Sequence, residues 1–171
     1  MTVEATVEEL RAAAAGAQGA VAALRDLRAQ VDDHQQQLEN PNAVREYIDF
    51  FRDFLTRAAS ELTTIAGELG SPIQPAQLDA LRQIASNSAA EQRRAGLFRD
   101  KWINKPLPYE TMRPLLSGIS NTTREQIESL RRLSETAAKL QALNTPDEPL
   151  DPKGRDRREL FNRLFRPGSD G

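Results

Sequence analysis

Apolar residues in the first half of the chain recur at alternating steps of three and four positions. This spacing keeps one face of a helix toward a partner, so residues 7–39 and 42–69 are predicted to form a long antiparallel hairpin with coiled-coil-like packing. The first seam contains Val7, Leu10, Ala14, Ala17, Val21, Leu24, Val31 and Leu38. The second contains Val44, Ile48, Phe51, Leu55, Ala58, Leu62, Ile65 and Leu69.

Two seam positions of the first helix carry polar residues, Arg28 and Gln35. We favour the interpretation that they lie toward a solvated edge of the bundle, where long side chains reach water. The alternative is that they fix the register or the oligomeric state, as polar seam residues do in coiled coils.

The ends of both hairpin helices have capping signals. Thr6 with Glu9 matches a capping box, which predicts the start of the first helix. Asn40 followed by Pro41 predicts the start of the second, and Gly70 predicts its end.

The second helix also carries apolar residues on its flank, so it needs a second neighbour: Tyr47, Phe50 and Phe54. We expect a third helix over 75–104, a short helical turn over 111–117, and a fourth helix over 122–143 that starts at a capping box of Thr122 and Glu125. The predicted fold is an all-α, elongated antiparallel four-helix bundle, with residues 1–143 as the bundle domain.

A dense apolar group joins the third and fourth helices. Its members are Trp102, Ile103, Leu107, Tyr109, Met112, Leu115, Leu116 and Ile119. We favour a structural plug at the open end of the bundle over a binding platform, because a bundle core must be closed at its ends.

Composition narrows the classes of function. The 171 residues have a net charge of −2 and a pI near 5.6, which argues against general binding to nucleic acid. Helix 75–104 is locally basic, but its Arg and Lys alternate with Glu91 and Asp100. There is no Cys, no signal-peptide pattern at the start, and no apolar run near the ~20 residues of a membrane span, so we expect a cytoplasmic protein.

Signatures of catalysis and metal binding are missing from the sequence. His34 is the only histidine, and Asp32, Asp33 and His34 are consecutive, so on a helix they point in different directions. No Gly-rich phosphate loop and no Gly-x-Ser-x-Gly motif occurs. We therefore expect no catalytic residues, no metal and no cofactor, and a protein that is not an enzyme.

The C-terminal segment gives the sharpest functional signal. Residues 144–154 are rich in Pro and acidic residues, which predicts a semi-rigid linker. Residues 155–171 then hold a short amphipathic helix and an irregular end, with two apolar pairs on one face of the helix. The expected partner-binding residues are Leu160, Phe161, Leu164, Phe165, Arg157 and Arg163. This layout is typical of a tethered docking peptide, although the segment can also fold back on its own bundle.

These patterns favour a protein–protein interaction or assembly protein that binds a protein partner through the C-terminal helix, with homo-oligomers through the helix seams as a further option. The layout resembles that of proteins recruited into larger assemblies, such as shell cargo or phage assembly factors, with no shared motif. The competing hypothesis is a membrane-surface protein, although an apolar face shorter than two turns holds a membrane weakly.

Overall fold

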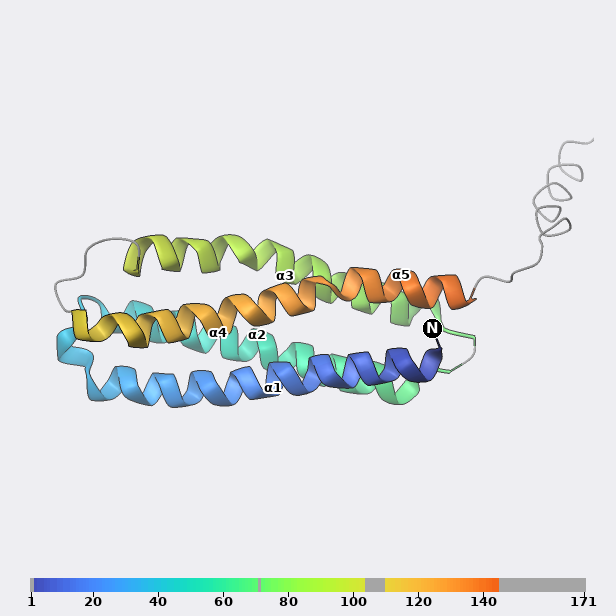
Figure 1. Cartoon of the computed structure of the whole chain (residues 1–171), viewed down its shortest axis with the longest axis horizontal. Coiled ribbons are helices and arrows are strands. Elements are labelled where there is room, and N and C mark those ends of the chain that lie inside the picture. Colours follow the sequence, from blue (N-terminus) through green and yellow to red (C-terminus); the bar gives the residue numbers. More distant parts are fainter. Residues whose placement is uncertain (1, 71, 104–109, 145–171) are drawn as a thin grey trace, which may run out of the picture.

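The computed structural model describes residues 2–70, 72–103 and 110–144, and these residues form an elongated bundle of antiparallel helices (Figure 1). The long helices are α1 (Val3–Asp33), α2 (Pro41–Glu68) and α3 (Pro75–Trp102), and α4 (Arg113–Arg131) and α5 (Leu133–Asn144) follow each other along the fourth arm. Short 3₁₀ helices, η1 (Gln35–Gln37) and η2 (Glu110–Met112), lie at one end. The predicted all-α bundle is thus confirmed.

The seam residues form the core between α1 and α2, which pack along each other more extensively than any other pair of helices. In α2 every predicted seam residue is buried except Leu69, which is half-buried. In α1 the half-buried exceptions are Val7 and Val21. Small side chains in α1, Ala14 and Ala17 among them, are buried in the same core. The predicted register of the hairpin is therefore confirmed.

The first helix begins earlier than predicted. Thr2 is the N-cap of α1, and its side-chain oxygen accepts a hydrogen bond from the Ala5 amide. Thr6, the predicted cap, is fully buried inside the helix, and its hydroxyl donates to the Thr2 carbonyl at 3.1 Å. The capping box at Thr6 was thus wrong, because the hydroxyl of Thr6 is satisfied by the preceding turn. The Asn40 cap of α2 is confirmed, with its side chain accepting from the Ala43 amide at 3.1 Å.

The fourth arm also differs from the prediction. A single helix, α4, starts at Arg113 and runs through the predicted cap at Thr122. The short turn predicted over 111–117 instead falls in η2 and the start of this helix, and Pro114 sits in the first turn of α4, where a missing amide hydrogen costs nothing. The arm breaks at Arg132, between α4 and α5, where the sequence pattern predicted continuity.

The apolar group between α3 and α4 is buried wherever the structure describes it. Trp102, Met112, Leu115, Leu116 and Ile119 are all in the core. Their burial agrees with the structural-plug interpretation. Leu107 and Tyr109 lie outside the described residues.

The four arms are not packed equally. Contacts between α2 and α3 are few, whereas α3 packs closely on α4 and α5. The connection between α2 and α3 lies at the same end of the bundle as the start of α1 and the end of α5 (Figure 1). The sparse contact between α2 and α3 leaves a groove along this side of the bundle, described next.

Candidate functional site

The groove between α2 and α3 contains two cavities, one above the other along the helices. We call the first the Phe54 cavity; it has a volume of about 290 Å³ and is lined by Phe50, Phe54, Arg57, Ala58, Glu61, Ile84, Asn87, Ala90 and Glu91. We call the second the Trp102 cavity; it has a volume of about 230 Å³ and is lined by Ala43, Glu46, Tyr47, Arg94, Leu97, Phe98, Lys101 and Trp102. Together they form the α2–α3 groove.

Aromatic rings make up much of the wall of this groove. Tyr47 and Phe98 stack across it with their ring centroids 4.0 Å apart, and Phe98 is tilted against Trp102 at 6.5 Å. Phe50 and Phe54 are parallel, one turn apart on α2, and both are only half-buried. Aromatic surface of this kind is enriched at protein–protein contacts.

A cation separates the two cavities. The guanidinium of Arg94 lies over the ring of Phe50, 4.0 Å from its centroid, and its Nε donates to Glu91 Oε1 at 3.0 Å. A cation over an aromatic face contributes about 0.5–1 kcal/mol at an exposed site. Arg94 therefore covers apolar surface and pairs with an acid of its own helix, as expected for a solvated basic face. At the far end Lys101 lies over Trp102 in the same way, at 5.4 Å.

Tyr47 joins the groove to the core. Its ring is buried, and this burial raises the pKa of the phenol to about 12. The nearby Thr123 side chain and the positive charges of Arg124 and Arg94 act in the opposite direction and lower this pKa by a smaller amount. The phenol therefore stays neutral across the physiological range. Tyr47 thus acts as an apolar wall with a protonated hydroxyl.

The most exposed large apolar residue of the described chain lies at the mouth of the Trp102 cavity. Leu97 is 57 % exposed, although its neighbour Phe98 is buried. A single exposed leucine is ordinary for a protein surface, but this one borders the aromatic lining of the Trp102 cavity. The α2–α3 groove therefore combines an aromatic lining with an exposed leucine, Leu97, and with charged residues at its edges.

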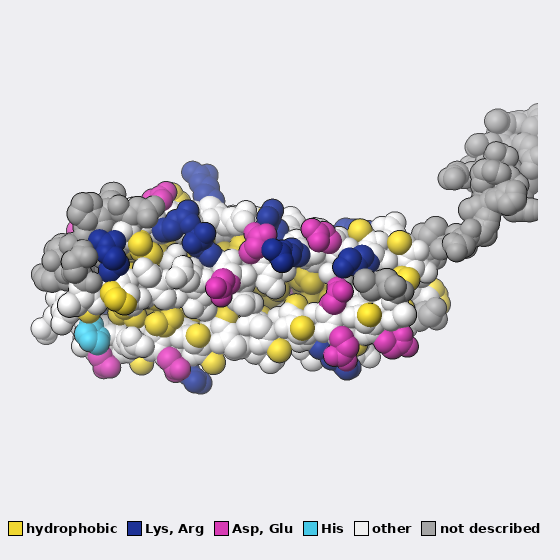
Figure 2. Space-filling model, in the orientation of Figure 1, with side chains coloured by type: hydrophobic (Ala, Val, Ile, Leu, Met, Phe, Trp, Pro, Cys, Tyr) yellow, Lys and Arg dark blue, Asp and Glu magenta, His cyan; other side chains and the backbone are white. Residues whose placement is uncertain are grey.

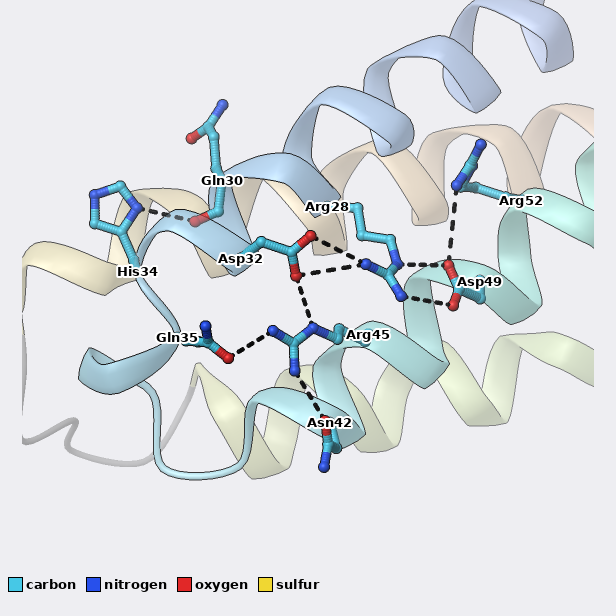
Figure 3. A network of polar contacts seen from close by, with 9 residues as sticks. All are labelled: Arg28, Gln30, Asp32, His34, Gln35, Asn42, Arg45, Asp49 and Arg52. Atoms are coloured by element: carbon cyan, nitrogen blue, oxygen red, sulfur yellow. Dashed lines mark hydrogen bonds and ion pairs between the residues drawn. The ribbon is translucent and has the colours of Figure 1, made fainter.

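A network of polar contacts ties α1 to α2 near the turn between them (Figure 3). Arg28 donates to Asp49 through Nε at 2.8 Å and Nη2 at 3.3 Å, and it also reaches Asp32. Arg45 donates to Asp32 at 2.7 Å and to Gln35 at 2.8 Å. The hydrogen bond to Asp49 raises the pKa of Arg28.

This network changes how the two polar seam residues are understood. Gln35 is exposed at the end of the bundle, as expected, but its side-chain oxygen is held by Arg45. Arg28 is paired across the helix interface, so it is more than a solvated edge residue. Its contacts are those expected of a residue that fixes the register of the hairpin.

A wider groove of about 650 Å³ lies on the surface along the junction of α3 and α4, but its lining mixes charges of both signs. Arg99, Arg124 and Arg132 face Glu125 and Glu128 there. Arg131 donates a hydrogen bond to Glu128 that lowers the pKa of this carboxyl. Figure 2 shows Lys and Arg gathered over α3 and α4, with Asp and Glu interspersed. This face is a solvated, ion-paired surface rather than a single-sign patch.

The six predicted partner-binding residues, from Arg157 to Phe165, lie outside the described residues, as do positions 145–154 of the linker predicted over 144–154 and the end of the chain. Asn144, the first residue of that predicted linker, is instead the last residue of α5. His34 ends α1, and its Nδ1 lies 2.9 Å from the Gln30 carbonyl, a local contact at a helix end. Across the described ranges, no three His, Cys, Asp or Glu side chains cluster as metal ligands. No described helix combines the length and apolar character needed to cross a membrane.

Sequence patterns drew attention to parts of the groove but not to the groove itself. The flank of Tyr47, Phe50 and Phe54 was predicted to face a second helix, and in the structure it faces α3 across the cavities. The contact of Arg94 with Phe50 was missed, because residues of different helices have no common sequence signal. Comparison with protein-family models, with curated proteins and with solved structures finds no match to this chain.

Proposed function

We propose that this chain is a non-enzymatic protein–protein interaction or assembly protein, in which the bundle is a rigid carrier and residues 155–166 are the docking element. The observation that carries the proposal is the spacing of Leu160, Phe161, Leu164 and Phe165 behind a Pro-rich tether. Apolar residues at i, i+1, i+4 and i+5 form one face of a helix, the form in which amphipathic peptides enter a groove of a partner.

The bundle supports this proposal because α5, which precedes the C-terminal segment, contributes its own buried residues to the core. Leu133, Ala137 and Leu140 of α5 fill the fourth arm and are buried. Two buried hydroxyls are satisfied within their own helices: Ser88 donates to the Ile84 carbonyl and Thr123 to the Ile119 carbonyl. A carrier of this kind leaves the docking element free to bind elsewhere.

Capture of the partner from an extract of the source cells tests the proposal. The full chain is expected to retain a specific partner, and a chain that ends at Asn144 is expected to lose it. Leu160→Ala with Phe161→Ala should reproduce the loss, whereas Arg166→Ala should weaken binding less, because buried apolar anchors carry most interface energy. Equal retention by the full and shortened chains would contradict the proposal.

A second candidate is attachment to a membrane surface. Five Arg in residues 155–166, against Asp156 and Glu159, favour contact with anionic lipid. Flotation with anionic liposomes, with and without residues 155–166, separates the two candidates. Assembly into a phage or shell structure, association of copies of the chain and a cytoplasmic location stay predictions. Because the seam residues pack within one chain, an association of copies would use the outer faces.

A further inference from the structure

We propose that in the free protein the Phe54 cavity holds the chain's own residues 155–166, with Leu160 and Phe161 against Phe50 and Phe54. This inference rests on the proposed function, because the same apolar pairs serve both contacts, and it adds how the docking element is regulated: a partner must displace it from the bundle.

The described chain ends close to the Phe54 cavity. The end of α5 lies against the first half of α3, where Arg82 donates to Gln141. Ile84, which lines the cavity, is two positions beyond Arg82, roughly 3 Å along the helix axis at ~1.5 Å per residue. A Pro-rich stretch spans ~3.1 Å per residue, so residues 145–154 give a reach of roughly 30 Å, enough to pass around α3 to this cavity. The Trp102 cavity spans Arg94 to Trp102, about 18 to 30 Å beyond Arg82 along α3 at ~1.5 Å per residue, so only its far end lies at the limit of that reach.

The surface of the Phe54 cavity suits an apolar helix face. Phe50 and Phe54 present half-buried rings, Ile84 and Ala58 form the floor, and Ala90 leaves the mouth open. Such a lining is incompletely covered by the bundle itself, since α2 and α3 make few contacts. Two Leu-Phe pairs on one helical face supply the missing cover.

Charge complementarity favours the chain's own segment as the occupant. Residues 155–166 carry five Arg against Asp156 and Glu159, in a chain whose net charge is −2. Glu61 and Glu91 line the cavity from α2 and α3, together with Arg57, and Glu91 also pairs with Arg94 of its own helix. Glu61 is exposed and has no ion pair among the described residues. Arg157 and Arg163 flank the apolar pairs and meet these carboxylates on docking.

The tether allows a weak contact between residues 155–166 and the Phe54 cavity to be occupied. A tether of this length gives an effective concentration on the order of millimolar, so a contact with a dissociation constant in that range is about half occupied. A partner with a micromolar dissociation constant therefore displaces the segment readily.

Paramagnetic broadening in the full chain tests the inference. The chain has no Cys, so Asn162→Cys carries a single spin label without other changes. We expect loss of amide signals at the Phe54 cavity, for example Ile84 and Ala90, and none at the distant end of the bundle near the α1–α2 turn, for example Gln35 and Gln37. Ala90→Arg, which fills the mouth of the cavity, should restore the signals. Ala89→Arg, exposed and outside the lining, is the matched control and should leave the broadening intact.

The outcomes separate this inference from the proposed function. Broadening at another face, or at none, overturns the inference. Broadening of a ¹⁵N-labelled chain by a spin-labelled ¹⁴N chain also overturns it and identifies a second copy as the occupant. A partner captured through Leu160 and Phe161 without broadening at the Phe54 cavity leaves the proposed function standing alone. Broadening there with no captured partner supports the intramolecular contact and counts against the proposed function.

Discussion

Arg28 of α1 and Asp49 of α2 form a two-point ion pair across the hairpin, with both guanidinium–carboxylate distances at or below 3.3 Å. The side chains are 29 % and 47 % exposed, so water screens the pair and its contribution is modest. Its geometry is nevertheless specific, because a planar guanidinium meets a planar carboxylate in one relative position of the two helices.

A double-mutant cycle with Arg28→Ala and Asp49→Ala should give a coupling free energy of about 0.5–1 kcal/mol at low salt. The coupling should shrink in 1 M salt, where the Debye length is about 3 Å. Chemical denaturation of the four variants measures it. Arg25 and Asp26, neighbours on α1 that are 65 % and 71 % exposed, are the matched control and should show coupling near zero. Equal coupling at both pairs would mean that Arg28 adds nothing to register.

Phe51 lies at the centre of the core and is fully buried. Phe51→Ala should lower the free energy of unfolding by about 3–5 kcal/mol, because it removes a large apolar side chain and leaves a cavity. The half-buried Phe50 is the matched control, and Phe50→Ala should cost clearly less. Denaturant unfolding compares them, and similar losses would contradict the position of the seam.

The effect of a charge at the start of α2 needs a control chosen from the structure. Val44→Asp buries a carboxylate in the core, since Val44 is fully buried, and should destabilise strongly. Arg45, its neighbour, is not a neutral comparison, because it binds Asp32, Gln35 and Asn42. Glu46→Lys is the better control: Glu46 is exposed and should tolerate the change within about 0.5 kcal/mol. Thermal unfolding that ranks Glu46→Lys as the worse variant would reject this assignment.

The raised pKa of Tyr47 predicts that the folded protein loses stability at high pH. Its pKa is raised from 10 to about 12 in the folded protein, so between these values the unfolded chain loses a proton that the folded protein keeps. Stability from this residue is fully present below pH 10 and falls as the pH rises toward 12. Absorbance titration should show one tyrosine ionising late. Tyr47→Phe leaves a single tyrosine, and the late step should then be absent. A late step that survives in Tyr47→Phe would assign it elsewhere.

Sequence periodicity was sufficient for α2 and for the register of the hairpin, because the 3-4 pattern of apolar residues from Val44 to Ile65 defines one continuous face, and that face packs in the core. Helix ends were harder to predict. Thr6 and Thr122 both match capping boxes, yet each lies within a helix. In Thr6 the hydroxyl donates to the preceding turn instead of accepting at a cap. The α2–α3 groove depends on how far two helices separate, which no local pattern encodes.

The final prediction concerns the stability of the bundle without its C-terminal segment. A chain that ends at Asn144 keeps every buried residue of α5, so its unfolding should remain cooperative. A weak intramolecular contact stabilises the folded state by at most about 1 kcal/mol, which in a chain of this size corresponds to a shift of roughly 2–4 °C. Calorimetry of the full and shortened chains measures this shift. Trp102→Ala, which opens the buried end of the core, is the positive control and should lower the melting temperature by several times as much. A shortened chain as unstable as Trp102→Ala would show that residues 145–171 belong to the core, and the tethered docking element would have to be abandoned.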